Sequence, residues 1–236
     1  MESSIGFLWN ALETSIRLIF SFDGEVYGIV LRSLGFSLSA TVVAVLFGVP
    51  VGFLIGSKRF RGRSAVITIL NTAMALPTVV VGLIGYSFLS RSAPLGFLNL
   101  MFSPKAVILG EFLLSLPIIT NLTAAAVQSV HPAAIATART LGAGRFQTTW
   151  TILMEARFAL VAAIVVGYGR AVSEVGSAMM LGGNIRFYTR TMTTAIALET
   201  SKGEFGLGLA LGFFLLLVVL SVNILFHYFQ VRGRTG

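Results

Sequence analysis

Two opposite charges four residues apart, Arg170 and Glu174, interrupt an apolar run that extends from Phe158 to Leu181. If this run is one helix, the spacing puts both side chains on the same face, where they can neutralise each other. A single charge costs about 2.5–3.5 kcal/mol at the centre of a membrane helix. We therefore expect the pair to face a bundle interior, a dimer seam or a watery cavity. It serves either as a structural ion pair or as part of a gate or pathway.

The residue combinations that support catalysis are missing from the sequence. The lysines, at positions 58, 105 and 202, do not follow a glycine, so no Gly-Lys-Ser/Thr phosphate loop is present. His131 precedes Pro132, where a cap or turn role is expected, and it is far in sequence from His227. No Ser/His/Asp set or metal-spaced cluster converges on an apolar run, and cysteine is absent. We expect no catalytic centre, no bound cofactor and no metal.

The elements that must position the charged pair are membrane helices. The chain of 236 residues is 56% hydrophobic and only 11% charged, whereas soluble domains carry about 25% charged residues. Apolar runs of the length that spans a bilayer, about 18 residues or more, recur along it. We assign the net charge of +8 to basic loops at an anionic inner leaflet, and not to nucleic-acid binding. These features predict an all-α protein of the lipid bilayer.

Hydropathy predicts a single transmembrane domain over 1–236, with five spans inside a core of residues 25–230. The spans cover residues 26–56, 65–89, 106–127, 158–181 and 206–229. Residues 5–22 are apolar but carry Glu13 and Arg17, so they form either an amphipathic helix at the interface or a short extra span.

Prolines and small residues inside the spans predict how they bend and pack. Prolines kink helices, and small residues at every fourth position let helix backbones approach closely. The expected kinks lie at Pro50, Pro77 and Pro117. The expected packing faces are Gly48, Gly52 and Gly56 in the first span, and Gly169, Ser173 and Ser177 in the fourth.

The loop after the first span sets the orientation. It contains cations without an acid, so the positive-inside rule places it in the cytoplasm; the cations are Lys58, Arg59, Arg61 and Arg63. Alternation then puts residues 128–157 and the tail with Arg232 and Arg234 inside the cell, in a multi-pass protein of the cytoplasmic membrane. Residues 90–105 and 182–205 fall outside. Glu111, near the outer end of the third span, is expected at the interface.

Residues 128–157 form a polar break between the third and fourth spans. Their pattern predicts a helix, a turn at Gly142-Ala-Gly144 and a second amphipathic helix. An ordered elbow on one side of a membrane protein predicts a docking surface for a partner. The residues expected to couple to that partner are Ala138, Arg139, Thr140, Leu141, Gly142, Ala143, Gly144 and Arg145.

The elbow resembles the cytoplasmic docking motif of ABC importer permeases. That motif reads Glu-Ala-Ala, three residues, Gly, nine residues, Ile, any residue, Leu-Pro. Here it falls on Ala136, Thr137, Ala138, Gly142, Ile152, Met154 and Glu155. The Gly and Ile match, whereas the leading Glu and the closing Leu-Pro are replaced. In that family the short helix after the Gly sits in a groove of the ATPase subunit.

The segment from Gly169 to Ile185 is similar to the fourth-span motif of oxyanion permeases. Molybdate and sulfate permeases carry a similar Arg…Gly-Glu-Phe-Gly-Ala…Gly-Asn-Ile-Pro. Here Ser-Glu-Val replaces Gly-Glu-Phe, and Arg186 replaces the proline. The following residues 189–203 resemble the tungstate branch of the group. We assign Gly183, Asn184 and Arg186 to the outer mouth.

The resemblance, which covers residues 26–230, implies a type I ABC importer permease fold: five core transmembrane helices plus the N-terminal helix. It also implies a second permease copy, a cytoplasmic ABC ATPase dimer that binds the ATP, and an external tungstate- or molybdate-binding protein. Tungstate is the first expected substrate and molybdate the second; their similar size and charge place the selection in the binding protein. The alternatives are a subunit of a secondary transporter or channel, in which Arg170 and Glu174 serve ion coupling, and a membrane scaffold protein.

Overall fold

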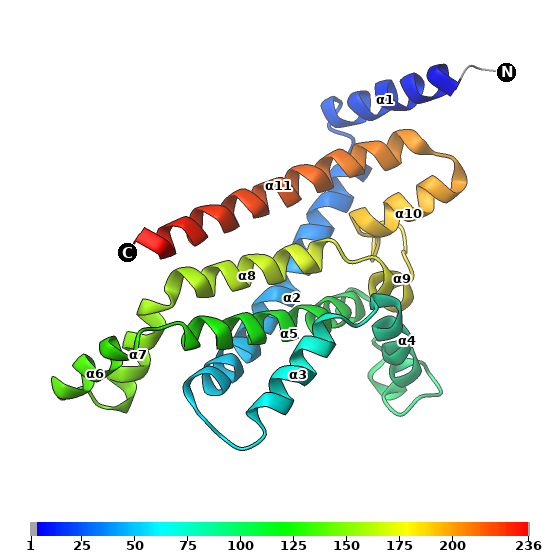
Figure 1. The fold of residues 1–236 in the computed structure, drawn as a ribbon. Helices are drawn as coiled ribbons and strands as arrows, with labels where there is room; N and C mark the ends of the chain where they lie inside the picture. Colours follow the sequence, from blue (N-terminus) through cyan, green and yellow to red (C-terminus); the bar gives the residue numbers. More distant parts are fainter. Residues whose placement is uncertain (1–3, 236) are drawn as a thin grey trace.

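The computed structural model describes residues 4–235, and their regular elements are all helical (Figure 1). The side chains of residues 231–235, with Arg232 and Arg234 of the inner tail, lie outside the described part. The helices are α1 Ser4–Phe20, α2 Gly24–Ser57, α3 Arg63–Met74, α4 Thr78–Leu89, the 3₁₀ helix η1 Gly96–Leu98, α5 Pro104–Gln128, α6 Pro132–Thr140, α7 Arg145–Glu155, α8 Arg157–Val172, α9 Gly176–Gly182, α10 Met192–Lys202 and α11 Phe205–Thr235.

Three of these helices, α2, α5 and α11, are long and apolar enough to cross a membrane. Two bent pairs bring the number of spans to as many as five: α3 with α4, and α7 with α8. The outward face of α11 exposes large apolar side chains that only hydrocarbon would cover well, namely Leu216, Leu217, Leu220 and Ile224. The described residues therefore form an all-helical bundle suited to a bilayer.

Helix α5 lies at the centre of the bundle and packs along α2 on one side and α8 on the other. The small-residue face predicted in the first span makes the first of these contacts. A Cβ atom on Gly56 would lie 2.7 Å from the Ala124 carbonyl oxygen and 2.7 Å from the Val127 Cβ. On the other side, the Ser115 hydroxyl donates to the Gly167 carbonyl across 3.1 Å. The prediction of glycine-mediated packing is confirmed for the first span.

The prolines act differently from one another. Pro50 and Pro117 stand inside continuous helices, whereas Pro77 separates α3 from α4, whose axes differ by 97°. Pro77 is the N-cap of α4 with extended backbone, a geometry that suits its fixed φ and missing N–H. The expected kinked span 65–89 is therefore two separate 12-residue helices.

The expected fourth span, 158–181, is wrong in its outer part. Helix α8 ends at Val172, Ser173 is its cap, and a new helix, α9, begins at Gly176. Ser173 and Ser177 therefore do not continue the helix face of Gly169. Residues distant in sequence stabilise this interruption between α8 and α9. The Thr193 hydroxyl donates to the Glu174 carbonyl, and α9 packs on α4.

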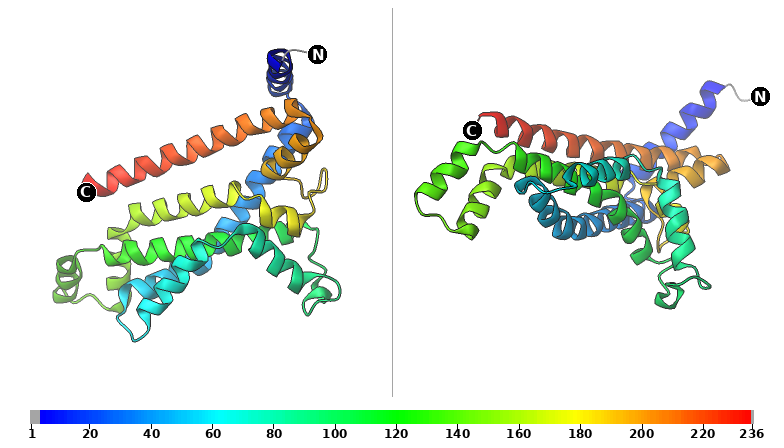
Figure 2. Two further views of the ribbon diagram at one scale, coloured as in Figure 1. Left: turned by 45° about the vertical axis from the view of Figure 1, so that its right-hand side comes forward. Right: turned by 60° about the horizontal axis from the view of Figure 1, so that its bottom comes forward.

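The segment 182–205, expected as an outer loop, contains the helix α10. Its first turn is buried, and Met192 joins the core cluster with Val26, Ile29 and Leu211. Figure 2 shows the α2–α3 loop, the α6–α7 elbow and the C-terminus toward one end of the bundle, and α1, α10 and η1 toward the other. This arrangement follows the alternation that the hydropathy pattern predicts.

Candidate coupling elbow and charged clusters

Local sequence chemistry builds the first half of the elbow. Pro132 occupies the first turn of α6, and the Nδ1 atom of His131 accepts a hydrogen bond from the Ala133 N–H across 3.2 Å. This confirms the predicted cap role of His131. At the other end, Gly142 has a φ of +84°, in the left-handed region that favours glycine. The Ala143 N–H donates to the Ala138 carbonyl and closes the helix end.

The second half of the elbow is a short amphipathic helix. At the start of α7 the Gln147 side chain accepts from the Gly144 N–H across 2.8 Å. Thr148 and Ile152 are buried on the inner face of α7. The opposite face of α7 is exposed: Phe146 is 82% and Trp150 56% exposed, and Leu141 in the preceding turn is also 82% exposed. The elbow thus presents an apolar surface outside the transmembrane bundle.

The predicted coupling residues, 138–145, are contiguous in the structure and form the end of α6, the turn and the first residue of α7. Arg139, Leu141, Gly142 and Arg145 are exposed, and open space surrounds the position where a Gly142 Cβ would lie. Glycine is therefore favoured at position 142 by the positive φ of the backbone, and not by a lack of space for a side chain. In Figure 1 the elbow projects at the end of the bundle, clear of the long helices.

Arg170 and Glu174 form the ion pair that their spacing predicts, with 3.2 Å between guanidinium and carboxylate. The helix ends between them, so they are not side by side on one helix face. The other carboxylate oxygen of Glu174 accepts the Ser177 N–H across 2.8 Å, at the start of α9. The Glu174 side chain is only 1% exposed, whereas that of Arg170 is 29% exposed. The pair therefore ties α8 to α9 inside the bundle.

Glu111 lies elsewhere than expected. It is 2% exposed in the middle of the bundle, and its Oε2 atom lacks a hydrogen-bond partner in the described chain. The expected interfacial position is wrong because α9 packs on this part of α5, where a Cβ on Gly110 would lie 2.9 Å from the Ser177 hydroxyl. The helical neighbours of Glu111 at i+3 and i+4, Leu114 and Ser115, are also buried.

The three residues assigned to the outer mouth lie in the turn after α9. Gly183 has a φ of +70°, and a Cβ there would lie 2.7 Å from the Phe102 ring. The Asn184 amide donates to the Thr194 carbonyl across 3.1 Å. Arg186 reaches across to the start of α2, where its Nε donates to Glu25 across 2.7 Å. This bond raises the pKa of Arg186.

Sequence reasoning missed a second charged cluster at this end of the bundle. Arg190 is buried and lies 3.4 Å from Glu199 and 3.7 Å from Glu25. Lys202 bonds Glu199 from the solvent side across 3.1 Å. The cluster joins α2, the 183–191 turn and α10, which are far apart in sequence. The one signal of this cluster in the sequence is the i,i+3 spacing of Glu199 and Lys202, which places them on the same face of a helix.

Comparison with known proteins gives both sequence and fold relatives. Residues 48–234 match the family described as the binding-protein-dependent transport system inner membrane component. The chain is 41% identical over 211 residues to a "Probable anion ABC transporter permease protein" of Haloferax volcanii, covering 86% of this chain and 91% of that one. It is 37% identical over 223 residues to the "Tungstate uptake system permease protein TupB" of Campylobacter jejuni, covering 94% and 93%.

A solved structure of the MetNI methionine ABC transporter, described as inward facing, has the same fold. The TM-score is 0.58 at 19% sequence identity, over 89% of this chain and 93% of that chain. This likeness supports the type I importer permease fold. At such low sequence identity, the structural likeness gives no information about the substrate.

Proposed function

Because the chain belongs to the binding-protein-dependent transport system inner membrane component family, we propose that it is the permease subunit of an ATP-driven ABC importer for a tetrahedral oxyanion. Tungstate is the first substrate and molybdate the second. The name of the Campylobacter jejuni relative supports tungstate, and that of the Haloferax volcanii relative supports an anion. The family does not favour a secondary transporter or channel.

The observation that carries this proposal is the elbow. The elbow lies outside the bundle and exposes the apolar side chains Leu141, Phe146 and Trp150. An exposed apolar patch of this kind is typical of a surface that a partner covers. Aromatic side chains at the centre of a contact are typical anchors of protein interfaces. We assign the partner as a cytoplasmic ABC ATPase dimer, which supplies the phosphate loop that is not present in this sequence.

In the proposed cycle, two copies of the chain enclose the pathway and each docks one ATPase. Closure of the ATPases on ATP moves the elbows. The movement passes from α7 through a 65° bend into α8. Helix α8 ends at the Arg170–Glu174 pair, which is bonded to α9, and α9 packs on α4. Packed helices that move as rigid elements can carry such coupling.

The external binding protein delivers the oxyanion and selects it. Tungstate and molybdate are dianions of nearly equal size, so this chain discriminates poorly between them. The charged cluster around Arg186 and Arg190 lies at the delivery end of the bundle. Hydrolysis of ATP returns the pathway to the inward-open state.

The test combines copurification with uptake. The chain is expressed with its ATPase and binding protein, and uptake of labelled tungstate, molybdate and sulfate is measured in cells with and without it. We expect an ATPase with a phosphate loop to copurify, and uptake of tungstate to depend on the chain. Isolation of the chain without an ATPase, or uptake of all three anions without it, would refute the proposal.

A further inference from the structure

A large cavity opens where the inner ends of α2 and α5 meet the elbow. Its volume is about 780 Å³. Its lining includes apolar side chains, among them Phe53, Val127 and Ile152. Five cations also line it: Lys58, Arg59, Arg63, Arg139 and Arg145.

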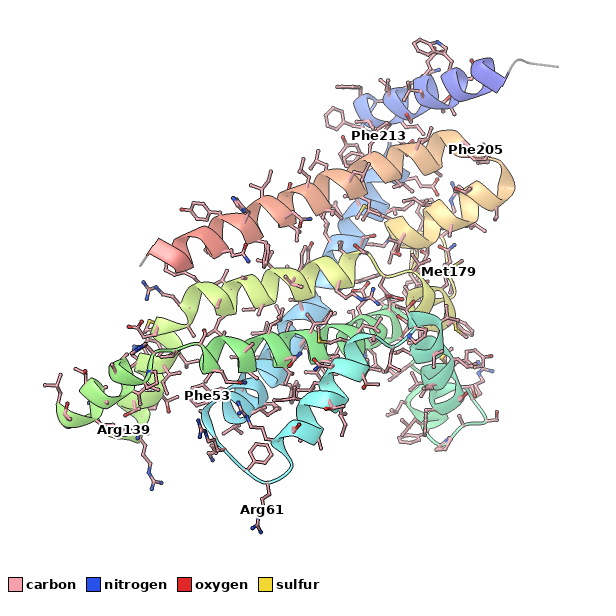
Figure 3. All side chains as sticks on the ribbon, in the orientation of Figure 1. Phe53, Arg61, Arg139, Met179, Phe205 and Phe213 are labelled. Carbon is pink, nitrogen blue, oxygen red and sulfur yellow. The ribbon has the colours of Figure 1, made fainter. Side chains whose placement is uncertain are left out.

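These cations come from two separate parts of the chain, the α2–α3 loop and the elbow. Figure 3 shows Phe53 on α2 near this end, and Arg61 at the tip of the loop with its side chain directed away from the bundle. Arg61 does not line the cavity. The fold, and not a run of basic residues, therefore selects which cations face the cavity.

No carboxylate from the described residues lines the cavity. Within the same residues, none of the five cations has an ion pair within 4 Å. Arg63 is nevertheless held in place, because its Nε donates to the Ile55 carbonyl at the end of α2 across 2.9 Å. The cavity thus combines an anchored guanidinium with uncompensated positive charge.

Like charges gathered around one space repel, by about 1 kcal/mol for a pair 4 Å apart in water and more where solvent is reduced. An anion in the space removes this cost. Guanidinium groups match the oxygens of phosphate-like anions with paired, charge-assisted hydrogen bonds. Basic pockets beside membrane helices on the cytoplasmic side are also where lipid head groups bind.

We propose that this cavity binds a tetrahedral oxyanion group. Its source is either the phosphate of an anionic phospholipid in the adjacent leaflet or a free oxyanion in solution. The apolar lining residues suit the glycerol and acyl part of a lipid, and the cations suit both sources. The site shares Arg139 and Arg145 with the predicted coupling residues. Anion binding is measured separately from ATPase association and uptake, so the two proposals can fail separately.

The experiment uses the full-length chain and two matched variants of one loop. Arg59→Gln removes a cation that lines the cavity, and Arg61→Gln removes the same charge from the tip of the same loop. Lys58→Gln is a second cavity variant, should Arg59→Gln fold poorly. One arm measures binding of tungstate and of inorganic phosphate to protein in uncharged detergent by calorimetry. The other counts phosphatidylglycerol retained against phosphatidylcholine by native mass spectrometry.

We expect saturable binding in at least one arm, with affinity about tenfold weaker in the cavity variants and unchanged in Arg61→Gln, since one charge-assisted contact is lost. Binding of the free anions assigns a soluble oxyanion site, and retention of phosphatidylglycerol alone assigns a lipid site. Absence of binding in both arms overturns the proposal. Equal weakening by Arg61→Gln also overturns it, because it would show a diffuse basic surface.

Discussion

The Arg170 guanidinium lies 3.2 Å from the Glu174 carboxylate across the end of α8, so this ion pair joins two helices. The other oxygen of the same carboxylate accepts the Ser177 N–H in the first turn of α9. A buried carboxylate with these two partners holds both the direction of α9 and its contact with α4. The pair therefore fixes how α9 follows α8.

Removal of Arg170 should be more damaging than removal of the Glu174 charge. Arg170→Met leaves an unpaired carboxylate that is 1% exposed, whereas Glu174→Gln leaves a guanidinium that is 29% exposed. We expect Arg170→Met to lower the free energy of unfolding by about 1–3 kcal/mol. This lies between the stability effects of breaking surface ion pairs and fully buried ones. Thermal unfolding in detergent measures it. The double variant Arg170→Met/Glu174→Gln should regain stability, because neither charge is left without its partner. A double variant no more stable than Arg170→Met alone would mean that the two side chains do not stabilise each other.

Tungstate uptake by that double variant separates the two roles of the pair. If it folds and transports, the pair is structural, and if it folds without transporting, the pair belongs to the gate or the pathway. We expect the structural outcome, because a pathway-lining Glu174 would repel a dianion.

Gly142→Asp should abolish association with the ATPase while the chain still inserts in the membrane. The substitution places a charge on the exposed turn between Leu141 and Phe146. Gly203→Asp is a matched control, because Gly203 also has a φ of +84° and open space around a Cβ, but lies at the opposite end of the fold. Copurification and uptake measure the result. Equal loss of association in both variants would point to backbone strain and contradict the docking assignment.

Gly56→Ala should destabilise the contact between α2 and α5 by about 1–3 kcal/mol, as overpacking does. Its Cβ would come within 2.7 Å of the Ala124 carbonyl oxygen, which belongs to the backbone. Gly35→Ala on the same helix meets nothing within 4 Å, and should be neutral or stabilising by about 0.5–1 kcal/mol. Unfolding midpoints compare the two. Similar midpoints would show that the close approach is absent in the membrane.

Glu199→Gln should destabilise the chain by about 2–4 kcal/mol, since it leaves the buried Arg190 with only the Glu25 carboxylate at 3.7 Å. Glu204→Gln, an exposed acid just beyond α10, should change stability by less than about 0.5 kcal/mol. Thermal unfolding of the two variants is the measurement. If both lose the same stability, the buried cluster contributes nothing specific.

Single cysteines should report the orientation in this naturally cysteine-free chain. All of the chosen positions are exposed. Arg61→Cys and Arg145→Cys should react with a membrane-impermeant maleimide only after the cells are opened. Ser92→Cys and Lys202→Cys should react in intact cells. Labelling of position 145 in intact cells would reverse the assigned orientation and place the elbow outside.

Much of the elbow and of the span order follows from local chemistry. Apolar runs long enough to cross a bilayer are visible in the sequence alone, and they recover α2, α5 and α11. His131, Pro132 and Gly142 start and end helices through groups within a few residues, so the elbow was predictable too. These features depend on propensity and hydropathy, which neighbouring residues determine.

Tertiary structure decided the rest, because the deciding partners come from distant segments. An apolar pattern does not reveal that α8 stops at Val172, where Thr193 and Ser177 bond Glu174. Nor does it reveal the burial of Glu111 or of Arg190, whose surroundings exist only after the helices pack. The sequence by itself determined where the chain enters the membrane and where it turns. Only packing decided which charges meet inside it, because hydropathy records the preference of each residue and not the identity of its neighbours.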